Sequence, residues 1–166
     1  SACSGGDALP ARVADRMPGT RAPRSARCDD SDGVRCLLPW PSNVYTVTDA
    51  TSATGVRLHV DARDLGRGDE ATQVNRADGF SRATPLLAGL AANLDAASLG
   101  DGDTGVMRLV VTEPGDAFGT TVPLRFHVIP ADDTRAPESV LIAYPRRPLR
   151  PASEHLAVVL DSLRTT

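Results

Sequence analysis

The chain has 166 residues, which suits one domain with a tail. Hydrophobic residues make up 41% of it and aromatic residues only 4%, so we expect a core built mainly from Val, Leu and Ala. The net charge of −3 is spread over interspersed signs, which excludes nucleic acid as an expected partner, and no apolar run approaches the roughly 20 residues that span a bilayer.

The first residues resemble the end of a bacterial lipoprotein signal. Small residues precede Cys3 and a Ser-Gly-Gly run follows it, and signal cleavage requires small side chains at such a site. The resemblance implies that Cys3 is lipidated and anchors the chain to a membrane, and Ser4 implies passage to an outer membrane. The alternative is a free thiol. We expect residues 1–27, rich in Ala, Arg, Gly and Pro, to be a disordered tether.

A short segment bounded by two cysteines follows the tether. Cys28 and Cys36 lie eight positions apart, and in an exported protein such a pair forms a local disulfide by default. A metal site is the weaker alternative, because no His or further Cys has ligand spacing.

The same segment contains a weak calcium candidate made of Asp29, Asp30 and Asp32. Several carboxylates followed by a glycine resemble the start of a calcium loop, but the twelfth position holds Trp40 or Pro41 in place of the required Glu. We therefore favour an exposed acidic turn, and no cofactor is expected. The Asp-Gly pairs at residues 101–105 are interpreted as turns for the same reason.

The middle of the chain alternates strand and turn signals. Residues 44–48 and 56–60 are rich in β-branched side chains and flank a Thr-Gly turn, so they predict a hairpin. Prolines on both sides of Trp40 predict an extended segment that presents the indole to a core, and Phe80 follows an Asp-Gly turn. Leucines at near-helical spacing predict a short helix within residues 85–99.

Three short motifs of this region resemble a known group of proteins. They are Cys-Leu-Leu-Pro-Trp-Pro-Ser at 36–42, Thr-Gly-Val-Arg at 54–57 and Asn-Arg-Ala-Asp-Gly-Phe-Ser at 75–81. Together they resemble the N-terminal region of large secreted bacterial lipoproteins, some of which are similar to virulence-type lipases with a later α/β-hydrolase domain. The resemblance covers residues 36–163. It implies an exported module that precedes a downstream domain of the same polypeptide.

The C-terminal half contains four strand signals separated by Pro and Gly turns. They lie at residues 105–113, 121–129, 139–144 and 154–160, and Val122, Leu124, Phe126 and Val128 alternate on one face of the second. This spacing predicts a mainly β, Ig-like antiparallel β-sandwich. Residues 144–164 also resemble the closing strand of bacterial Ig-like modules, whose pattern would continue past Thr166. We expect residues 28–166 to form this domain, with an irregular cover at 28–100 and a strand-rich part at 101–166.

A complete catalytic motif is missing from the sequence. Ser81 follows a turn but lacks the Gly-x-Ser-x-Gly context of a hydrolase nucleophile, so a structural role is favoured. His59, His127 and His155 each fall in a strand pattern without metal-ligand spacing, and His127 is expected to be exposed. Asp132 and Asp133 are interpreted as a loop.

The sequence thus predicts a non-catalytic module of an exported, lipid-anchored bacterial surface protein that spaces or supports a downstream domain. Two alternatives remain open. One is the N-terminal part of a secreted esterase or lipase, and the other is a surface adhesin or glycan-binding module, for which Trp40 and two Tyr are few stacking residues.

Overall fold

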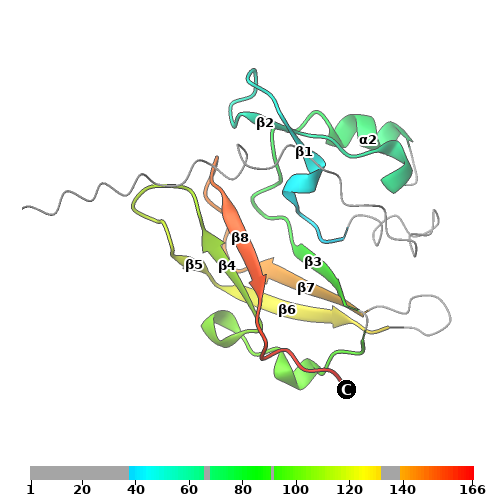
Figure 1. Cartoon of the computed structure of the whole chain (residues 1–166), viewed down its shortest axis with the longest axis vertical. Helices are drawn as coiled ribbons and strands as arrows, with labels where there is room; N and C mark the ends of the chain where they lie inside the picture. The colour runs from blue at the N-terminus through cyan, green and yellow to red at the C-terminus, as the bar shows by residue number, and fades with distance from the viewer. Residues whose placement is uncertain (1–37, 66–67, 91, 132–138) are drawn as a thin grey trace, which may run out of the picture.

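The computed structural model describes residues 38–65, 68–90, 92–131 and 139–166, and these form a mainly β structure with three antiparallel sheets and one short α-helix (Figure 1). The helix and the strands, in chain order, are β1 (Thr46–Thr48), β2 (Val56–Leu58), α2 (Gly68–Val74), β3 (Leu86–Leu90), β4 (Met107–Val111), β5 (Thr121–Val122), β6 (Leu124–Ile129), β7 (Ser139–Pro145) and β8 (His155–Val159).

The predicted hairpin is confirmed as the pair β1–β2. Thr46 pairs with Leu58 and Thr48 pairs with Val56. Gly55 adopts a φ of +77° in the connection, a left-handed conformation that glycine reaches without a steric penalty. Both strands are shorter than predicted, since residues 43–45 form a 3₁₀ turn before β1 and β2 ends at Leu58.

Helix α2 and the turn after it are tied to this hairpin by one asparagine. The side chain of Asn75 accepts the N–H of Val60 at 2.7 Å and donates to its carbonyl at 2.9 Å. The N–H of Leu58 donates to the carbonyl of Ala77 at 3.0 Å. With Ala71 of α2 buried, these contacts make hairpin and helix one unit above the two larger sheets (Figure 1).

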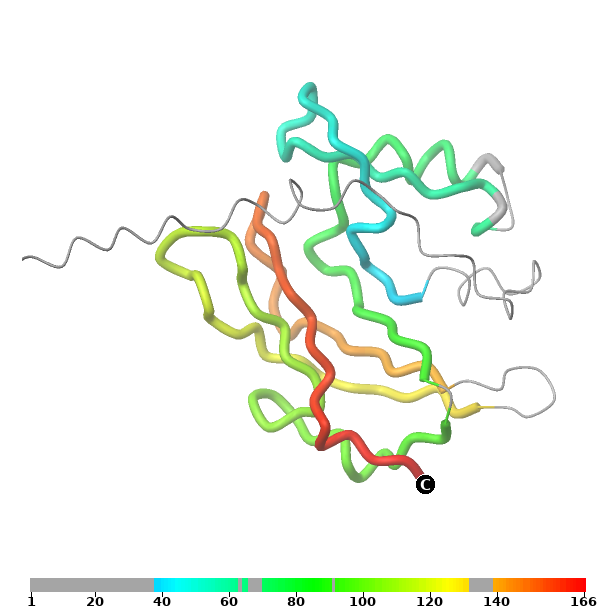
Figure 2. The backbone as a smooth tube through the Cα atoms, in the orientation of Figure 1, coloured from blue at the N-terminus to red at the C-terminus, as the bar shows by residue number. Residues whose placement is uncertain are grey.

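The two larger sheets are three-stranded, with orders β3–β7–β6 and β5–β4–β8. The tube in Figure 2 shows the chain passing between them. The prediction of a single strand over residues 121–129 is wrong in one respect, since this segment forms two strands, β5 and β6. It divides at Pro123, because Val122 pairs with Leu109 of β4 while Leu124 pairs with Pro145 of β7. Proline has no N–H to give to either ladder, so it suits the crossing point.

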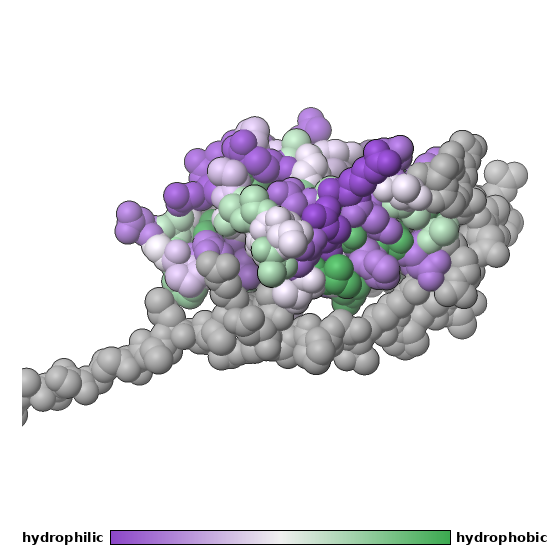
Figure 3. All heavy atoms as spheres, turned by 90° about the horizontal axis from the view of Figure 1, so that it is seen from above, coloured by the Kyte–Doolittle hydropathy of each residue, from purple (hydrophilic) through white to green (hydrophobic). Residues whose placement is uncertain are grey.

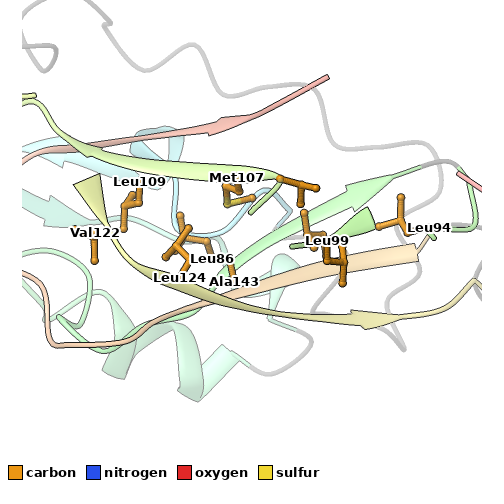
Figure 4. Close-up of a cluster of buried hydrophobic side chains, with 10 residues drawn as sticks. Leu86, Leu94, Leu99, Met107, Leu109, Val122, Leu124 and Ala143 are labelled. Carbon is orange, nitrogen blue, oxygen red and sulfur yellow. The ribbon is translucent and has the colours of Figure 1, made fainter. Parts of the chain in front are cut away.

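A shared hydrophobic core joins these sheets. Its side chains come from β3, β4, β5, β6 and β7 and from the turns between β3 and β4 (Figure 4). The least exposed are Val106 at 0%, Leu124 at 1% and Leu141 at 0%. The predicted alternation in the second C-terminal strand signal is confirmed, since Val122 and Leu124 are buried and Phe126 and Val128 pack against the core.

The helix predicted within residues 85–99 is wrong. Leu86–Leu90 is β3, an edge strand whose residues pair antiparallel with β7 from Leu86↔Ala143 to Leu90↔Ser139. Leucines four apart suit a helix, but Leu86 and Leu90 also lie on one face of a strand. The non-local pairing with β7 and the glycine at position 89 decide between the two.

Gly105 is packed against the ring of Phe126, and this contact generates a stability test. A Cβ at position 105 would lie 2.1 Å from Cε2 of Phe126, although the backbone φ of −65° suits any residue. We expect Gly105→Ala to lower the free energy of unfolding by about 1–3 kcal/mol through overpacking. Urea unfolding measures the change.

The matched control is the double variant Gly105→Ala/Phe126→Leu. The smaller Leu side chain removes the clash, so the alanine should cost less in the Phe126→Leu background than in the wild-type chain. Equal costs in both backgrounds would contradict the packing account.

Candidate functional site

A cavity of about 370 Å³ opens at one end of the β5–β4–β8 sheet. The end is defined by Val111, which pairs with His155 where β4 finishes and β8 starts. The residues that line the cavity are Val111, Ala117, Thr120, Val122, Arg147, Pro148, Leu149, Arg150 and His155. Five apolar and four polar side chains line the walls, so the cavity offers contacts to both an apolar and a charged group of a ligand.

The loop between β7 and β8 forms one wall and is held in place at Leu149. The N–H of Leu149 donates to the carbonyl of Arg82 at 2.8 Å, and Nε of Arg82 donates back to the carbonyl of Leu149 at 2.5 Å. This exchange fixes the loop at a point between Arg147 and Arg150, which are both exposed. The wall is therefore positioned by the turn before β3 as well as by its own strands.

The same loop contains a strained backbone position. Ala152 has a φ of +47°, the one positive φ among the non-glycine residues that the structure describes. For a residue with a Cβ this conformation costs roughly 1–2 kcal/mol. Ser153 donates from Oγ to the carbonyl of Arg150 at 2.9 Å and closes the turn. Strain of this kind often accumulates beside functional sites.

The arginines of this loop differ in their partners. Arg146 forms an ion pair with both carboxylate oxygens of Asp101, and its hydrogen bonds hold the pKa of Asp101 below its usual range. Arg147 and Arg150 have no ion-pair or hydrogen-bond partner for their guanidinium groups within the described part of the chain. Two positive charges at the cavity are therefore available to an anionic ligand.

His155 places an imidazole on the cavity lining. Its Nδ1 lies 3.3 Å from the carbonyl oxygen of Ser153, and its Nε2 is buried with no partner among the residues described. Burial lowers the pKa of His155. A neutral ring that donates through Nδ1 has an unused acceptor at Nε2, and protonation converts this atom into a donor.

The hydroxyl groups beside His155 are engaged with backbone carbonyls. Oγ of Ser153 donates to Arg150, as above, and Oγ1 of Thr120 donates to the carbonyl of Ala117 at 2.7 Å. A nucleophilic triad requires a hydroxyl that is hydrogen-bonded to the imidazole. In the described residues the cavity has the groups for binding an anion and lacks this arrangement.

The structure places the other sequence-predicted residues on separate elements. Ser81 is exposed in a turn, where its Oγ accepts the N–H of Ala83 at 3.3 Å. His59 follows β2, and His127 is exposed on β6, as predicted for the face opposite Phe126. The predicted turn at 101–105 is confirmed, with Asp101 capping a 3₁₀ turn over Gly102–Thr104.

Several predicted site residues lie outside the described residues. They are Cys3, the cysteines Cys28 and Cys36, the acidic residues Asp29, Asp30 and Asp32, and the loop residues Asp132 and Asp133. In the described ranges no group of three or more His, Cys, Asp or Glu side chains is arranged to hold a metal ion. None of the helices described there has the length and hydrophobicity to cross a membrane.

Three of the six aromatic residues, Trp40, Tyr45 and Phe80, form a cluster that does not line the cavity. The ring of Trp40 lies 5.6 Å from that of Tyr45 and 4.9 Å from that of Phe80, the latter edge-on. The backbone of Trp40 also bridges Leu87 of β3. The indole therefore contributes to packing between the hairpin unit and β3. Seen from the hairpin side, most of the surface drawn in colour is hydrophilic with small apolar patches (Figure 3).

Sequence reasoning missed the cavity itself. Its lining comes from two segments, residues 111–122 and 147–155, whose proximity results from the pairing of β4 with β5 and β8. The usable signal was the run of arginines among prolines at 146–151, a density of positive charge in a chain with net charge −3.

Comparison of the chain with protein-family models, with curated proteins and with solved structures found no match.

The lowered pKa of His155 generates a stability test. Below its ordinary pKa of 6.5 the unfolded chain binds a proton at this ring more readily than the folded chain does. We therefore expect the free energy of unfolding to fall as the pH decreases from 7.5 to about 5.5. The matched control is His127→Gln on exposed β6, which should keep this pH dependence, whereas His155→Gln should reduce it. Urea unfolding at pH 7.5 and pH 5.5 measures the free energy of unfolding. An unchanged pH dependence in His155→Gln would contradict its attribution to His155.

Proposed function

We propose that this chain is a non-catalytic, Ig-like β-sandwich module that binds an anionic group at one end of the sandwich. We further propose that it belongs to an exported, lipid-anchored bacterial surface protein, in which it spaces or supports a downstream domain. The observation that carries the proposal is the cavity lined by Arg147, Arg150 and His155, where neither arginine has a partner for its guanidinium group among the described residues.

Support for a sandwich comes from the core shared by the two three-stranded antiparallel sheets. Inner-face side chains alternate with outer ones along β4, where Met107, Leu109 and Val111 are buried and the two residues between them are half-buried. Ig-like modules have this construction of two antiparallel sheets over one core, with connecting loops gathered at the ends. The cavity is formed by such end loops.

Support for binding rather than catalysis comes from the partners of the hydroxyl groups. Ser81, Ser153 and Thr120 all use their hydroxyl oxygens in local turn contacts. The ligand that fits best is a small carboxylate with an apolar body. Arg147 and Arg150 would hold the carboxylate, and the side chains of Val111, Val122 and Leu149 would contact the body.

The proposed cellular role rests on the sequence. Cys3 within a lipoprotein-like end, two further cysteines eight residues apart and a turn-rich composition are typical of exported bacterial proteins. A short module of this kind suits a spacer between membrane and active domain.

The binding proposal is tested with butyrate as the probe. We expect titration of sodium butyrate at pH 7.5 to shift the amide resonances of residues 111–122 and 147–155 in ¹H–¹⁵N spectra, because the guanidinium groups of Arg147 and Arg150 attract the carboxylate. The double variant Arg147→Ala/Arg150→Ala should bind about tenfold more weakly, which corresponds to ~1.4 kcal/mol.

Matched controls separate charge from hydrophobic contact. Butylamine has the same apolar body with the opposite charge and should not bind, and Arg164→Ala removes an exposed arginine outside the cavity and should bind like the wild type. Equal binding of butyrate and butylamine would refute the anion site. Hydrolysis of p-nitrophenyl butyrate that disappears in Ser81→Ala would refute the non-catalytic part.

The anchor is tested on native protein extracted from membranes. We expect mass spectrometry to find acyl chains on Cys3 and a cross-linked peptide containing Cys28 and Cys36, and we expect Cys3→Ser to leave the membrane fraction, because the acyl chains supply the apolar contact with the bilayer. Unmodified Cys3 on membrane-extracted protein would contradict the anchor and leave the binding proposal untouched.

A further inference from the structure

Strand β8 combines an edge position with exposed apolar side chains. Leu156, Val158 and Val159 are 53%, 39% and 42% exposed, and the five residues His155–Val159 contain no Asp, Glu, Lys or Arg. Among the described strands β8 pairs with β4 alone, and Figure 1 shows it beside β4, with β5 on the other side of β4. Large exposed apolar side chains that gather on one element usually mark a contact surface.

The unpaired side of β8 offers a row of backbone groups. The carbonyl of Glu154 accepts from Thr112, and the N–H of Leu160 donates to Val106, so even-numbered residues of this segment face β4. In an antiparallel ladder the residues between them direct N–H and C=O to the opposite side. His155, Ala157 and Val159 therefore present backbone donors and acceptors that have no partner within the described part of the chain.

The other edges of the two larger sheets have protection that β8 lacks. The edge of β3 is bridged by Trp40, whose N–H and C=O both bond to Leu87. β6 is bounded by Pro123 and carries exposed Arg125 and His127. β5 is only two residues long. Short strands, prolines, inserted charges and covering segments are the usual means of preventing edge-to-edge pairing, so an edge without them is suited to pairing.

We propose that β8 pairs with β8 of a second copy of this chain, antiparallel and centred on Ala157. In this arrangement His155 lies opposite Val159 of the second copy, and the outward N–H and C=O groups of both strands satisfy one another. Two β5–β4–β8 sheets become one continuous six-stranded sheet with the two-fold symmetry usual for homodimers.

The composition of β8 favours a copy of itself as the occupant. Pairing centred on Ala157 sets Leu156 opposite Val158 of the second copy, so both contacts across the axis are between apolar side chains. They lie on the face of the sheet opposite the core, together with half-buried Val110 of β4, which pairs with Leu156. Because the strand is uncharged, the symmetric arrangement places no like charges opposite one another.

The experiment is sedimentation velocity of the full chain from micromolar to hundreds of micromolar concentration. We expect a reversible monomer–dimer equilibrium, and we expect Leu156→Lys/Val158→Lys to raise the dissociation constant by at least about tenfold, because it places like charges across the two-fold axis. Ala157→Pro should weaken the dimer too, since it removes an outward N–H and no hydrogen bond to β4.

Val47→Lys is the matched control, because Val47 is 44% exposed on β1 and lies in a different sheet. It should leave the dissociation constant unchanged. A chain that is monomeric at every concentration overturns the proposal and leaves the edge to a strand of another polypeptide. A dimer that the β8 variants do not weaken overturns it as well.

Hydrogen exchange on the wild-type chain tests the proposal even if a variant fails to fold. The amides of His155, Ala157 and Val159 should exchange more slowly as concentration rises, while those of Val47 and other exposed residues away from β8 should not change. Concentration-independent exchange at the three amides would overturn the proposal. Butyrate binding is measured separately on the same material, so failure of the dimer and failure of the anion site are distinguishable.

Discussion

The crossing of the chain at Pro123 is the constraint on which the rest of the structure depends. Val122 and Leu124 flank the proline and are both buried, at 8% and 1% exposure, although each belongs to a different sheet. Two residues apart, they point to the same side of the chain and enter one core. The crossing thereby fixes β4 against β7. β4 in turn pairs with β8 and contains Val111, which lines the cavity.

Much of the β architecture follows from local sequence, because strands with one buried face have an unambiguous period of two. The alternation of Val122, Leu124, Phe126 and Val128 was predicted on this basis, whereas β4, β7 and β8 were predicted from apolar, β-branched runs between Pro and Gly turns. β3 was not, since Leu86 and Leu90 suit a helix and a strand equally and only β7, some fifty residues later, decides. α2 also escaped detection because it is short and Ala71 is the one buried side chain among residues 70–74, so its stability comes from the packing and from Asn75 rather than from propensity.

The candidate site was harder to predict from the sequence than the fold, because it too depends on non-local contacts. Arg147, Arg150 and His155 are near one another in sequence, but nothing local says that Val111 and Val122 lie beneath them. Nor does the sequence say that Arg146 pairs with Asp101 while Arg147 and Arg150 have no such partner in the described part of the chain. Which exposed arginine meets a carboxylate depends on the conformation of the loop. Two hydrogen bonds between Arg82 and Leu149 hold this loop in place.

His155 connects the two proposals, because its side chain and its backbone serve different surfaces. The imidazole lines the cavity, while the N–H and C=O belong to the unpaired edge of β8. Pairing of β8 with a second strand would restrict the backbone of His155, and an anion in the cavity would restrict its side chain. Two events that each restrict the same residue reduce the entropy cost of one another, so dimerisation and anion binding are expected to be linked with equal strength in both directions. The sign is positive, since neither event requires the ring or the backbone to leave the position that it has in the isolated chain.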